Sequence, residues 1–247
     1  NVPYSGMPTG NLKVTATDPI LIANGVIMVG QAEGDATLTG SGVDFTMKGL
    51  VTAGLPLGGM QASGEVEVNY SSATQAFSGQ VANPVFTSDM VEVTSTETAT
   101  FDQTGFQLGS AEATIVTNSA SLQGKMTNIS ADASGLKIGT FEAQSIQVLD
   151  AQANLTLTDI TIGSGGLSVG SASTQLMPNK ISIVPNFIEA TSVTATATFA
   201  NNNVDFTLEG TLLATNQQNL IAEGNVKITI ENEQPNVDIT NGTLIGN

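Results

Sequence analysis

Residues 193–210, VTATATFANNNVDFTLEG, consist of two alternating segments joined by three asparagines. Apolar residues occupy the odd positions from 193 to 199 and the even positions from 204 to 208, with polar residues between them. A period of two is typical of a strand with one buried and one wet face. Asparagine tolerates the left-handed backbone of a tight turn. The stretch therefore predicts two antiparallel strands joined by a short hairpin turn.

Comparable patterns occur elsewhere in the chain. Residues 226–230 alternate between apolar and polar side chains, and Asn24-Gly25 is typical of a type I′ hairpin turn. The residues between turns are mainly Val, Ile, Thr and Phe, which favour strands, and amphipathic periods of 3.6 are rare. We predict an all-β protein, an elongated repetitive antiparallel β-meander of long hairpins. The sequence leaves a jellyroll or taco, a sandwich and a solenoid-like arrangement open.

The plan of strands is repeated within the chain. Residues 36–49, ATLTGSGVDFTMKG, and 197–210, ATFANNNVDFTLEG, share a V-D-F-T-x-x-G core at an offset of 161. The likeness continues from 62–68 to 222–228 after one gap. These matches predict an internal duplication, with 36–68 resembling 197–228, inside a single elongated repetitive unit over 11–247. The polar, turn-rich residues 1–10 are predicted to be a flexible N-terminal segment.

A shorter repeat lies between the two copies. The pattern G-[FL]-x-[LIV]-G-[ST] begins at Gly105, Gly135 and Gly166, which are 30 and 31 residues apart. That distance accommodates two strands of about a dozen residues and their turns, at about 3.3 Å per residue. The repeat therefore predicts one long hairpin per motif.

The composition restricts the chemistry that the chain can carry out. Cys, His, Trp and Arg are absent, and the formal net charge is −16. Such a chain is repelled by phosphate backbones, which argues against a nucleic-acid partner. Without His and Cys, the usual nucleophile–base pairs and zinc sites cannot form. We therefore expect no enzymatic activity, no cofactor and no metal site. No apolar run approaches the roughly 20 residues of a transmembrane segment.

Two pairs of carboxylates are candidates for a catalytic or calcium-binding site. Glu65 with Glu67, and Glu231 with Glu233, lie two residues apart, so each pair shares the outward face of a strand. Paired carboxylates can hydrolyse glycosides, but two tyrosines and no tryptophan offer little to line a sugar cleft. Oxygen ligands also suit Ca²⁺, and the sequence leaves calcium binding open. A solvated acidic face is the favoured interpretation.

The segment ILIANGVIMV, residues 20–29, is apolar at consecutive positions on both sides of its turn. One interpretation is a hairpin buried on both faces within its own fold. The other is a subunit contact or a complementing strand, because exposed apolar edges pair with other chains. The candidate assembly hairpin comprises Ile20, Leu21, Ile22, Val26, Ile27, Met28 and Val29.

The words ASGEVEV (62–68) and AEGNVKI (222–228), with strands ending F-T-x-x-G, resemble repeats of the OstA-like family of periplasmic lipopolysaccharide-transport bridges. The resemblance implies an antiparallel, V-shaped β-jellyroll that holds acyl chains in its groove. It also implies a periplasmic protein that binds or transports a lipid or another hydrophobic ligand.

Two functional hypotheses follow. The first is a non-enzymatic structural or adhesive β-repeat protein, located extracellularly, at the cell surface or in the periplasm. Low charge and repeated hairpins favour it, and they predict self-assembly into a fibre, surface layer or appendage, with further copies or other envelope proteins as partners. The alternative is the lipid-binding or hydrophobic-ligand-binding function implied by the OstA-like resemblance.

Overall fold

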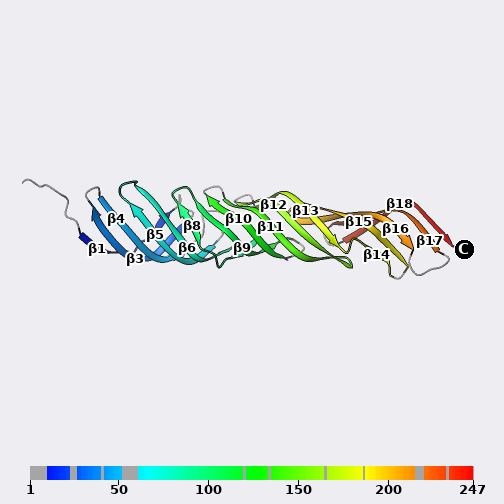
Figure 1. Ribbon diagram of the computed structural model, residues 1–247, viewed down its shortest axis with the longest axis horizontal. Coiled ribbons are helices and arrows are strands. Elements are labelled where there is room, and N and C mark those ends of the chain that lie inside the picture. The colour runs from blue at the N-terminus through cyan, green and yellow to red at the C-terminus, as the bar shows by residue number, and fades with distance from the viewer. Residues whose placement is uncertain are drawn as a thin grey trace, which may run out of the picture. The chain divides into compact units, whose positions relative to one another are not determined.

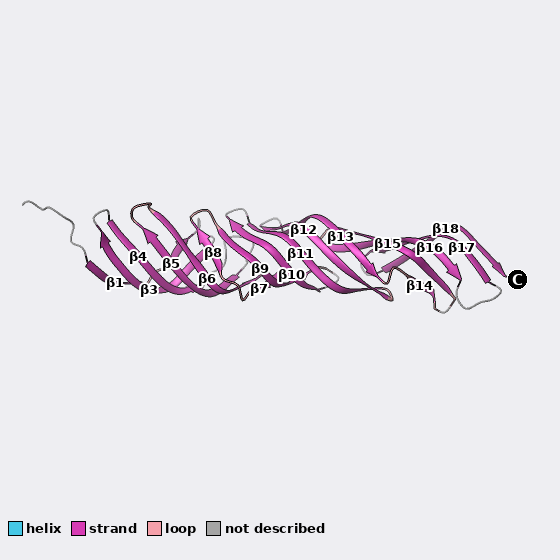
Figure 2. Ribbon diagram, in the orientation of Figure 1, coloured by secondary structure: helices cyan, strands magenta, loops and turns pink. Residues whose placement is uncertain are grey.

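The structure, a computed structural model, confirms the predicted all-β fold class. The part of the chain that it describes forms antiparallel strands and contains no helix (Figure 2). The described residues are 10–22, 27–39, 42–51, 61–118, 121–132, 135–163, 166–185, 187–214, 220–231 and 234–246. Within them, no helix is long and apolar enough to cross a membrane. The predicted Asn24-Gly25 turn and most of the predicted flexible segment lie outside these residues.

The strands follow one another as hairpins, and in Figure 1 β3 to β6 lie side by side in chain order. Their bounds are β1 (Gly10–Ala16), β2 (Ile20–Ile22), β3 (Ile27–Thr39), β4 (Gly42–Val51), β5 (Gln61–Ser71), β6 (Ala76–Thr87), β7 (Val91–Thr94), β8 (Ala99–Asp102), β9 (Phe106–Val116), β10 (Ser121–Asp132), β11 (Gly135–Val148), β12 (Ala151–Gly163), β13 (Gly166–Met177), β14 (Ile181–Val184), β15 (Ile188–Ala200), β16 (Asn203–Ala214), β17 (Leu220–Glu231) and β18 (Gln234–Gly246). A 13-stranded sheet contains β1 to β13, and a five-stranded sheet contains β14 to β18 in chain order.

The chain divides into two compact units that are interleaved in sequence. The first unit contains residues 1–114, 125–139 and 161–167, and the second contains the remaining residues. Strands β9 to β13 each contribute residues to both units. No single boundary in the sequence therefore separates the units.

The two copies of the repeated sequence have equivalent strand pairing. Ala36 lies opposite Phe45 in β3 and β4, and Ala197 lies opposite Phe206 in β15 and β16, at the same offset of 161. The register shifts at equivalent places, because Gln31 in β3 and the corresponding Ser192 in β15 both adopt a positive φ. Such β-bulges bend a strand and increase its twist. The two similar sequence segments thus form hairpins with the same strand register and the same bulge position.

The 30-residue motif marks alternate strands of the large sheet. Gly105 precedes β9, Gly135 opens β11 and Gly166 opens β13, so successive motifs are separated by one hairpin. The apolar positions of the first two motifs are buried, including Phe106 and Leu136. This arrangement agrees with the predicted hairpin for each motif.

A second backbone signature, in β6 and β10, combines a glycine with a left-handed asparagine. Asn83 and Asn128 have φ values of 48° and 55°, and Gly79 and Gly124 lie four residues before them. A Cβ atom at Gly124 would lie 2.1 Å from the carbonyl oxygen of Glu142 on β11. Only glycine allows this close approach between neighbouring strands.

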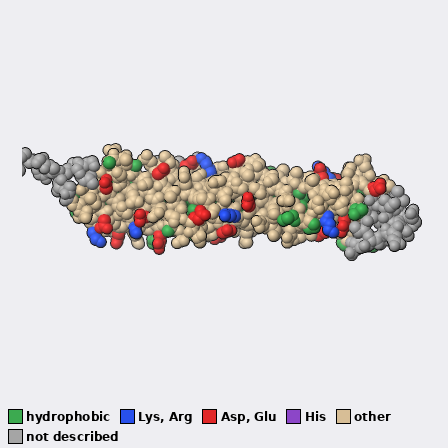
Figure 3. Space-filling model, viewed as in Figure 1, with side chains coloured by type: hydrophobic (Ala, Val, Ile, Leu, Met, Phe, Trp, Pro, Cys, Tyr) green, Lys and Arg blue, Asp and Glu red, His purple; other side chains and the backbone are tan. Residues whose placement is uncertain are grey.

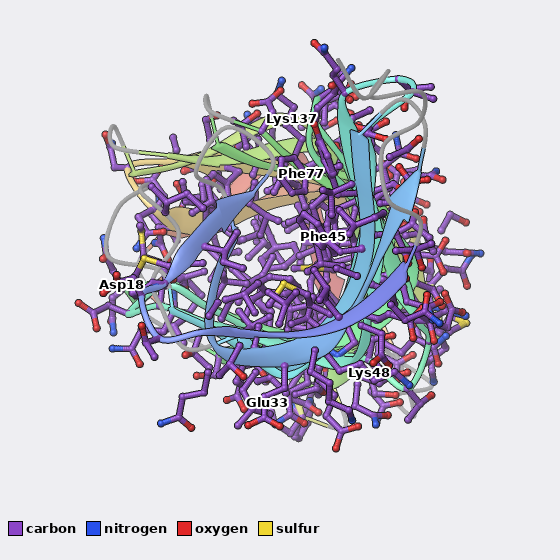
Figure 4. The ribbon with its side chains drawn as sticks, turned by 90° about the vertical axis from the view of Figure 1, so that its left-hand side faces the viewer. Asp18, Glu33, Phe45, Lys48, Phe77 and Lys137 are labelled. Carbon is purple, nitrogen blue, oxygen red and sulfur yellow. The ribbon has the colours of Figure 1, made fainter. Side chains whose placement is uncertain are left out.

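Alternating side chains fill the interior of each unit. In the first unit, buried Val66, Val68 and Phe106 belong to this core, and Figure 4 shows Phe45 and Phe77 pointing into the space enclosed by the bent strands. In the second unit, Phe141 and Leu155 are fully buried. The outward positions between them are polar. On the face shown in Figure 3, acidic side chains and lysines are scattered and hydrophobic side chains are sparse.

Candidate functional site

The candidate site consists of the two terminal strands, β1 and β18, each of which has one backbone edge without a strand partner among the described residues. Among the described residues, β1 pairs only with β3 and β18 pairs only with β17. An edge strand presents a row of N–H and C=O groups that have no ladder partner and can pair with another strand. Each terminal strand is therefore a template for strand addition.

Strand β1 also has an exposed apolar face. Leu12 lies opposite Ala36, and Ala16 lies opposite Ala32, so their side chains continue the inward face of β3. Ala32 and Ala36 are buried, whereas 52% of Leu12 is exposed. Val14, on the same face, is only partly buried. The apolar face of the first unit thus extends to β1, where Leu12 is exposed to solvent and Val14 is partly exposed.

Strand β18 has the same properties in the second unit. Val237 lies opposite Ile228, and Ile239 lies opposite Val226. Both partners on β17 are buried, whereas Val237 is exposed and 50% of the Ile239 side chain is accessible. Every residue of 234–243 is exposed. Strand β18 therefore combines an open edge with an uncovered apolar face, as β1 does.

The predicted assembly hairpin lies beside β1. Strand β2 pairs with β3 through Ile20–Val29, Leu21–Met28 and Ile22–Ile27, and it uses the same edge of β3 as β1, because β4 occupies the other edge. Val29 is buried and Leu21 is exposed, so the hairpin is neither wholly core nor wholly surface. Val26 lies outside the described residues. The structure thus extends the terminal edge to β2, and the role of this hairpin in assembly stays a prediction.

The predicted pair Glu65 and Glu67 lies on the outward face of β5. Glu67 lies opposite Lys48 on β4, and the Lys48 Nζ atom is 3.4 Å from its Oε2 atom. Both carboxylates and Lys48 line a surface hollow of about 390 Å³. Of the second pair, Glu231 is exposed and Glu233 lies outside the described residues. In the described part of the chain, no three acidic side chains are grouped to hold a metal ion.

Other carboxylates bind hydroxyl and amide groups near turns. Asp44 accepts hydrogen bonds from the hydroxyl and the backbone N–H of Ser72, both at 2.7 Å. Glu97 accepts hydrogen bonds from the hydroxyl of Ser110 at 2.6 Å and from its N–H at 2.9 Å. In each case the hydroxyl, followed by the amide, lowers the pKa of the carboxyl group, because these bonds favour the charged form. Both carboxylates thus have a structural role at their turns.

An aromatic cluster, which the sequence analysis missed, lies at the inward face of β4, β5 and β6. The ring centroids of Phe45 and Tyr70 are 5.1 Å apart, and those of Tyr70 and Phe77 are 4.8 Å apart. The three residues are directly opposite one another in the sheet, and each is partly buried. Cross-strand aromatic contacts of this kind stabilise a sheet. Only the strand register, which the sequence did not provide, brings them together.

No protein-family model, curated protein or solved structure matches the chain. The acyl-chain groove implied by the OstA-like resemblance stays a prediction. The hollow beside Lys48 lies on the outward, charged face of the sheet. The strongest functional signal of the structure is therefore the exposed pair of terminal strands.

Proposed function

We propose that the chain is a structural protein whose copies assemble through their terminal strands. The observation that carries this proposal is that β1 and β18 each combine an open backbone edge with exposed apolar side chains. An isolated domain usually protects its edge strands with short length, bulges or a covering segment. Strand β18 extends over 13 residues, and its bulge lies near Asn241, so residues 234–240 form an uninterrupted edge.

Both components of such a contact favour assembly. Strand addition gives the exposed N–H and C=O groups the ladder partners that they lack. It also removes Leu12, Val237 and Ile239 from water, and the burial of apolar surface is the main driving force of association. Repetitive proteins need polar terminal repeats to stay soluble as single molecules. Terminal strands with exposed apolar faces therefore favour the addition of further copies at the ends of the molecule.

The remaining surface supports a structural role more than a chemical one. Its polar positions are mainly Thr, Ser, Asn and Gln, and the chain has neither His nor Cys for acid–base or nucleophilic catalysis. A net charge of −16 makes the copies repel one another, so the terminal contacts must outweigh this repulsion. We place this role outside the cell or in the cell envelope, where fibres and surface layers are built.

Sedimentation equilibrium of the purified chain tests the proposal. The weight-average mass should rise with protein concentration between about 1 µM and 1 mM, the range typical of moderate protein affinities. Electron microscopy of the concentrated sample should show assemblies of repeated units. A single species with the 25.2 kDa mass of the monomer at every concentration would contradict the proposal.

A further inference from the structure

We propose that β18 of one copy pairs in parallel with β1 of the next copy, with residues 236–240 beside residues 11–15. This inference rests on the proposed self-assembly and specifies its partner, a second copy of this chain, and the orientation and register of the contact. It follows from the backbone groups, the side chains and the bends of the two terminal strands.

The register of each sheet decides which backbone groups lie on its open edge. Thr39 lies opposite Gly42, two residues further along the turn, and Glu231 faces Gln234 in the same way. Partners at this separation exchange both backbone hydrogen bonds, and successive residues of a strand bond to opposite neighbours. Counting along the ladders from these pairs gives the residues whose backbone groups lie on the open edges: Asn11, Lys13 and Thr15 of β1, and Val237 and Ile239 of β18.

These two edges fit each other only as a parallel pair. The edge residues of β1 have polar side chains on the outward face, whereas Val237 and Ile239 have apolar side chains on the inward face. In an antiparallel pair, residues that bond each other share a face, so one of the two sheets would be inverted. In a parallel pair, each residue bonds to the two neighbours of the residue beside it, so the faces of the two copies coincide.

The parallel contact gives the open groups of both strands their hydrogen-bond partners. The N–H of Lys13 donates to the C=O of Val237, and the C=O of Lys13 accepts from the N–H of Ile239. The N–H of Thr15 donates in turn to the C=O of Ile239. Pro235 also lies at this edge and has no N–H, but the acceptor for that missing donor falls before β1. The proline therefore leaves the ladder intact.

The side chains of the two strands match position by position. Residues 11–15 are NLKVT and residues 236–240 are NVDIT, so asparagine lies beside asparagine, threonine beside threonine and each aliphatic residue beside another. All of these residues are exposed in the single chain except Val14, which is partly buried. Pairing therefore covers apolar side chains of both copies on the inward face, and such burial drives association.

The charged side chains also match, on the outward face. Lys13 lies opposite Asp35 of β3. Asp238 lies opposite Lys227 of β17, which lies opposite Glu209 of β16. The proposed contact places Lys13 beside Asp238 and joins the two rows, so that negative and positive side chains alternate across it. Opposite charges on neighbouring strands stabilise a sheet.

The bends of the two strands select this register. Strand β1 ends at Ala16, before β2 begins, and β18 is interrupted at Asn241, where φ is 52° and the pairing with β17 shifts nearby. The proposed register places Ala16 beside Asn241. A shift of two residues keeps the faces correct but moves the bulge of β18 away from the end of β1, and it places Lys13 beside Asn236 or Thr240.

The charges further favour contact between unlike strands. Lys13 is the one charged residue of β1, and Asp238 is the one charged residue of β18. Two copies of β1, or two copies of β18, therefore bring no opposite charges together. A contact between unlike ends is heterologous, so it produces a ring or an open filament instead of a closed pair.

Disulfide cross-linking between two single variants tests the orientation and the register, because the chain has no cysteine of its own. Thr15→Cys in one chain and Thr240→Cys in the other place the two thiols side by side in the proposed contact, and both positions are exposed. Neighbouring strands are about 4.8 Å apart, within the Cα separation of a disulfide. Mild oxidation of the equimolar mixture should produce a dimer and no longer products, because each chain has one cysteine.

The matched control mixes Thr15→Cys with Asn236→Cys, which is displaced by four residues, or about 13 Å along the strand. This mixture, and each variant alone, should form at most about a tenth of the dimer. Equal products from the two mixtures would overturn the register, and a larger product from the control would overturn the parallel orientation. Efficient dimer formation by one variant alone would overturn the contact between unlike strands.

Charge removal provides a second measurement that does not depend on disulfide geometry. Lys13→Gln and Asp238→Asn should each weaken association about two- to fivefold, and the double variant should lose no more, because both changes remove one contact. Lys48→Gln removes the same positive charge from exposed β4 and should leave association unchanged. Wild-type assembly with neither the dimer nor this response would overturn the inference but leave self-assembly standing. A wild-type chain that stays monomeric would overturn the proposed function itself.

Discussion

Phe141→Ala should lower the free energy of unfolding by about 3–5 kcal/mol, the usual cost of removing a buried phenylalanine ring. Phe141 lies in β11 and is fully buried within the second unit. The loss combines the hydrophobic transfer energy of the ring with the contacts that surrounding side chains lose around the resulting cavity. A domain with a typical stability of about 5–15 kcal/mol would then be close to its unfolding threshold.

Urea unfolding followed by far-ultraviolet circular dichroism measures this change as a shift in midpoint. Phe187→Ala is the matched control, because Phe187 is exposed near the start of β15, and it should cost less than about 1 kcal/mol. Equal losses for the two variants would contradict the location of the core on the inward face of β11.

Gly124→Ala should destabilise the chain by about 2–3 kcal/mol, although the substitution adds one methyl group. That methyl group would lie 2.1 Å from the carbonyl oxygen of Glu142 and 2.9 Å from the Cα atom of Ala143. Both contacts are with the backbone of β11, so no side-chain rotation relieves them. The two strands must move apart, which weakens their hydrogen bonds and the packing behind them.

Gly10→Ala is the control for Gly124→Ala in the same unfolding measurement. A Cβ atom at Gly10 has no neighbour within 4 Å, so this variant should change stability by less than about 1 kcal/mol. It can be slightly stabilising, because alanine restricts the unfolded chain more than glycine does. A Gly124→Ala variant as stable as Gly10→Ala would show that β10 and β11 do not approach so closely.

The strand pattern could be predicted from the sequence because side-chain alternation directly reports burial. In β15, Val193 and Ala197 are buried while Thr194 and Thr196 are exposed, as the period of two predicted. The repeated V-D-F-T-x-x-G core was equally informative, because the same residues produce the same hairpin register in both copies. The all-β fold class could therefore be predicted from the alternation of side chains and from the internal repeat.

The bends and the two interleaved units could not be predicted in the same way. Asn83 and Asn128 adopt left-handed conformations in the middle of strands, where asparagine more often signals a turn. The passage of β9 to β13 between units depends on where these long strands bend and pack, which is a property of the tertiary fold. A local pattern contains no information about such distant partners.

Only part of the candidate site could be predicted from the sequence, because the edges of a sheet depend on the order of its strands. The composition of residues 20–29 predicted a candidate assembly hairpin, and the structure places its first strand, β2, on the same edge of β3 as β1. By contrast, Leu12 and Ile239 belong to ordinary alternating strands. They become distinctive only when the sheet order identifies β1 and β18 as edges and leaves their apolar faces uncovered.

Two charge variants test the central claim, that copies assemble through the edges of β1 and β18. Leu12→Lys should disable β1 and Ile239→Lys should disable β18, because each places a charge among the apolar side chains of its terminal strand. Both positions are about half exposed in the single chain, so folding should be preserved. Leu50→Lys and Leu213→Lys are the matched controls, since 51% and 50% of those side chains are exposed on strands away from the two ends.

Sedimentation velocity of the wild-type chain and of each variant at the same concentration is the decisive measurement. Each end variant should form smaller assemblies than the wild-type chain, because one of its two terminal strands no longer pairs. The control variants should assemble like the wild-type chain. End variants that assemble like the wild type would contradict the account.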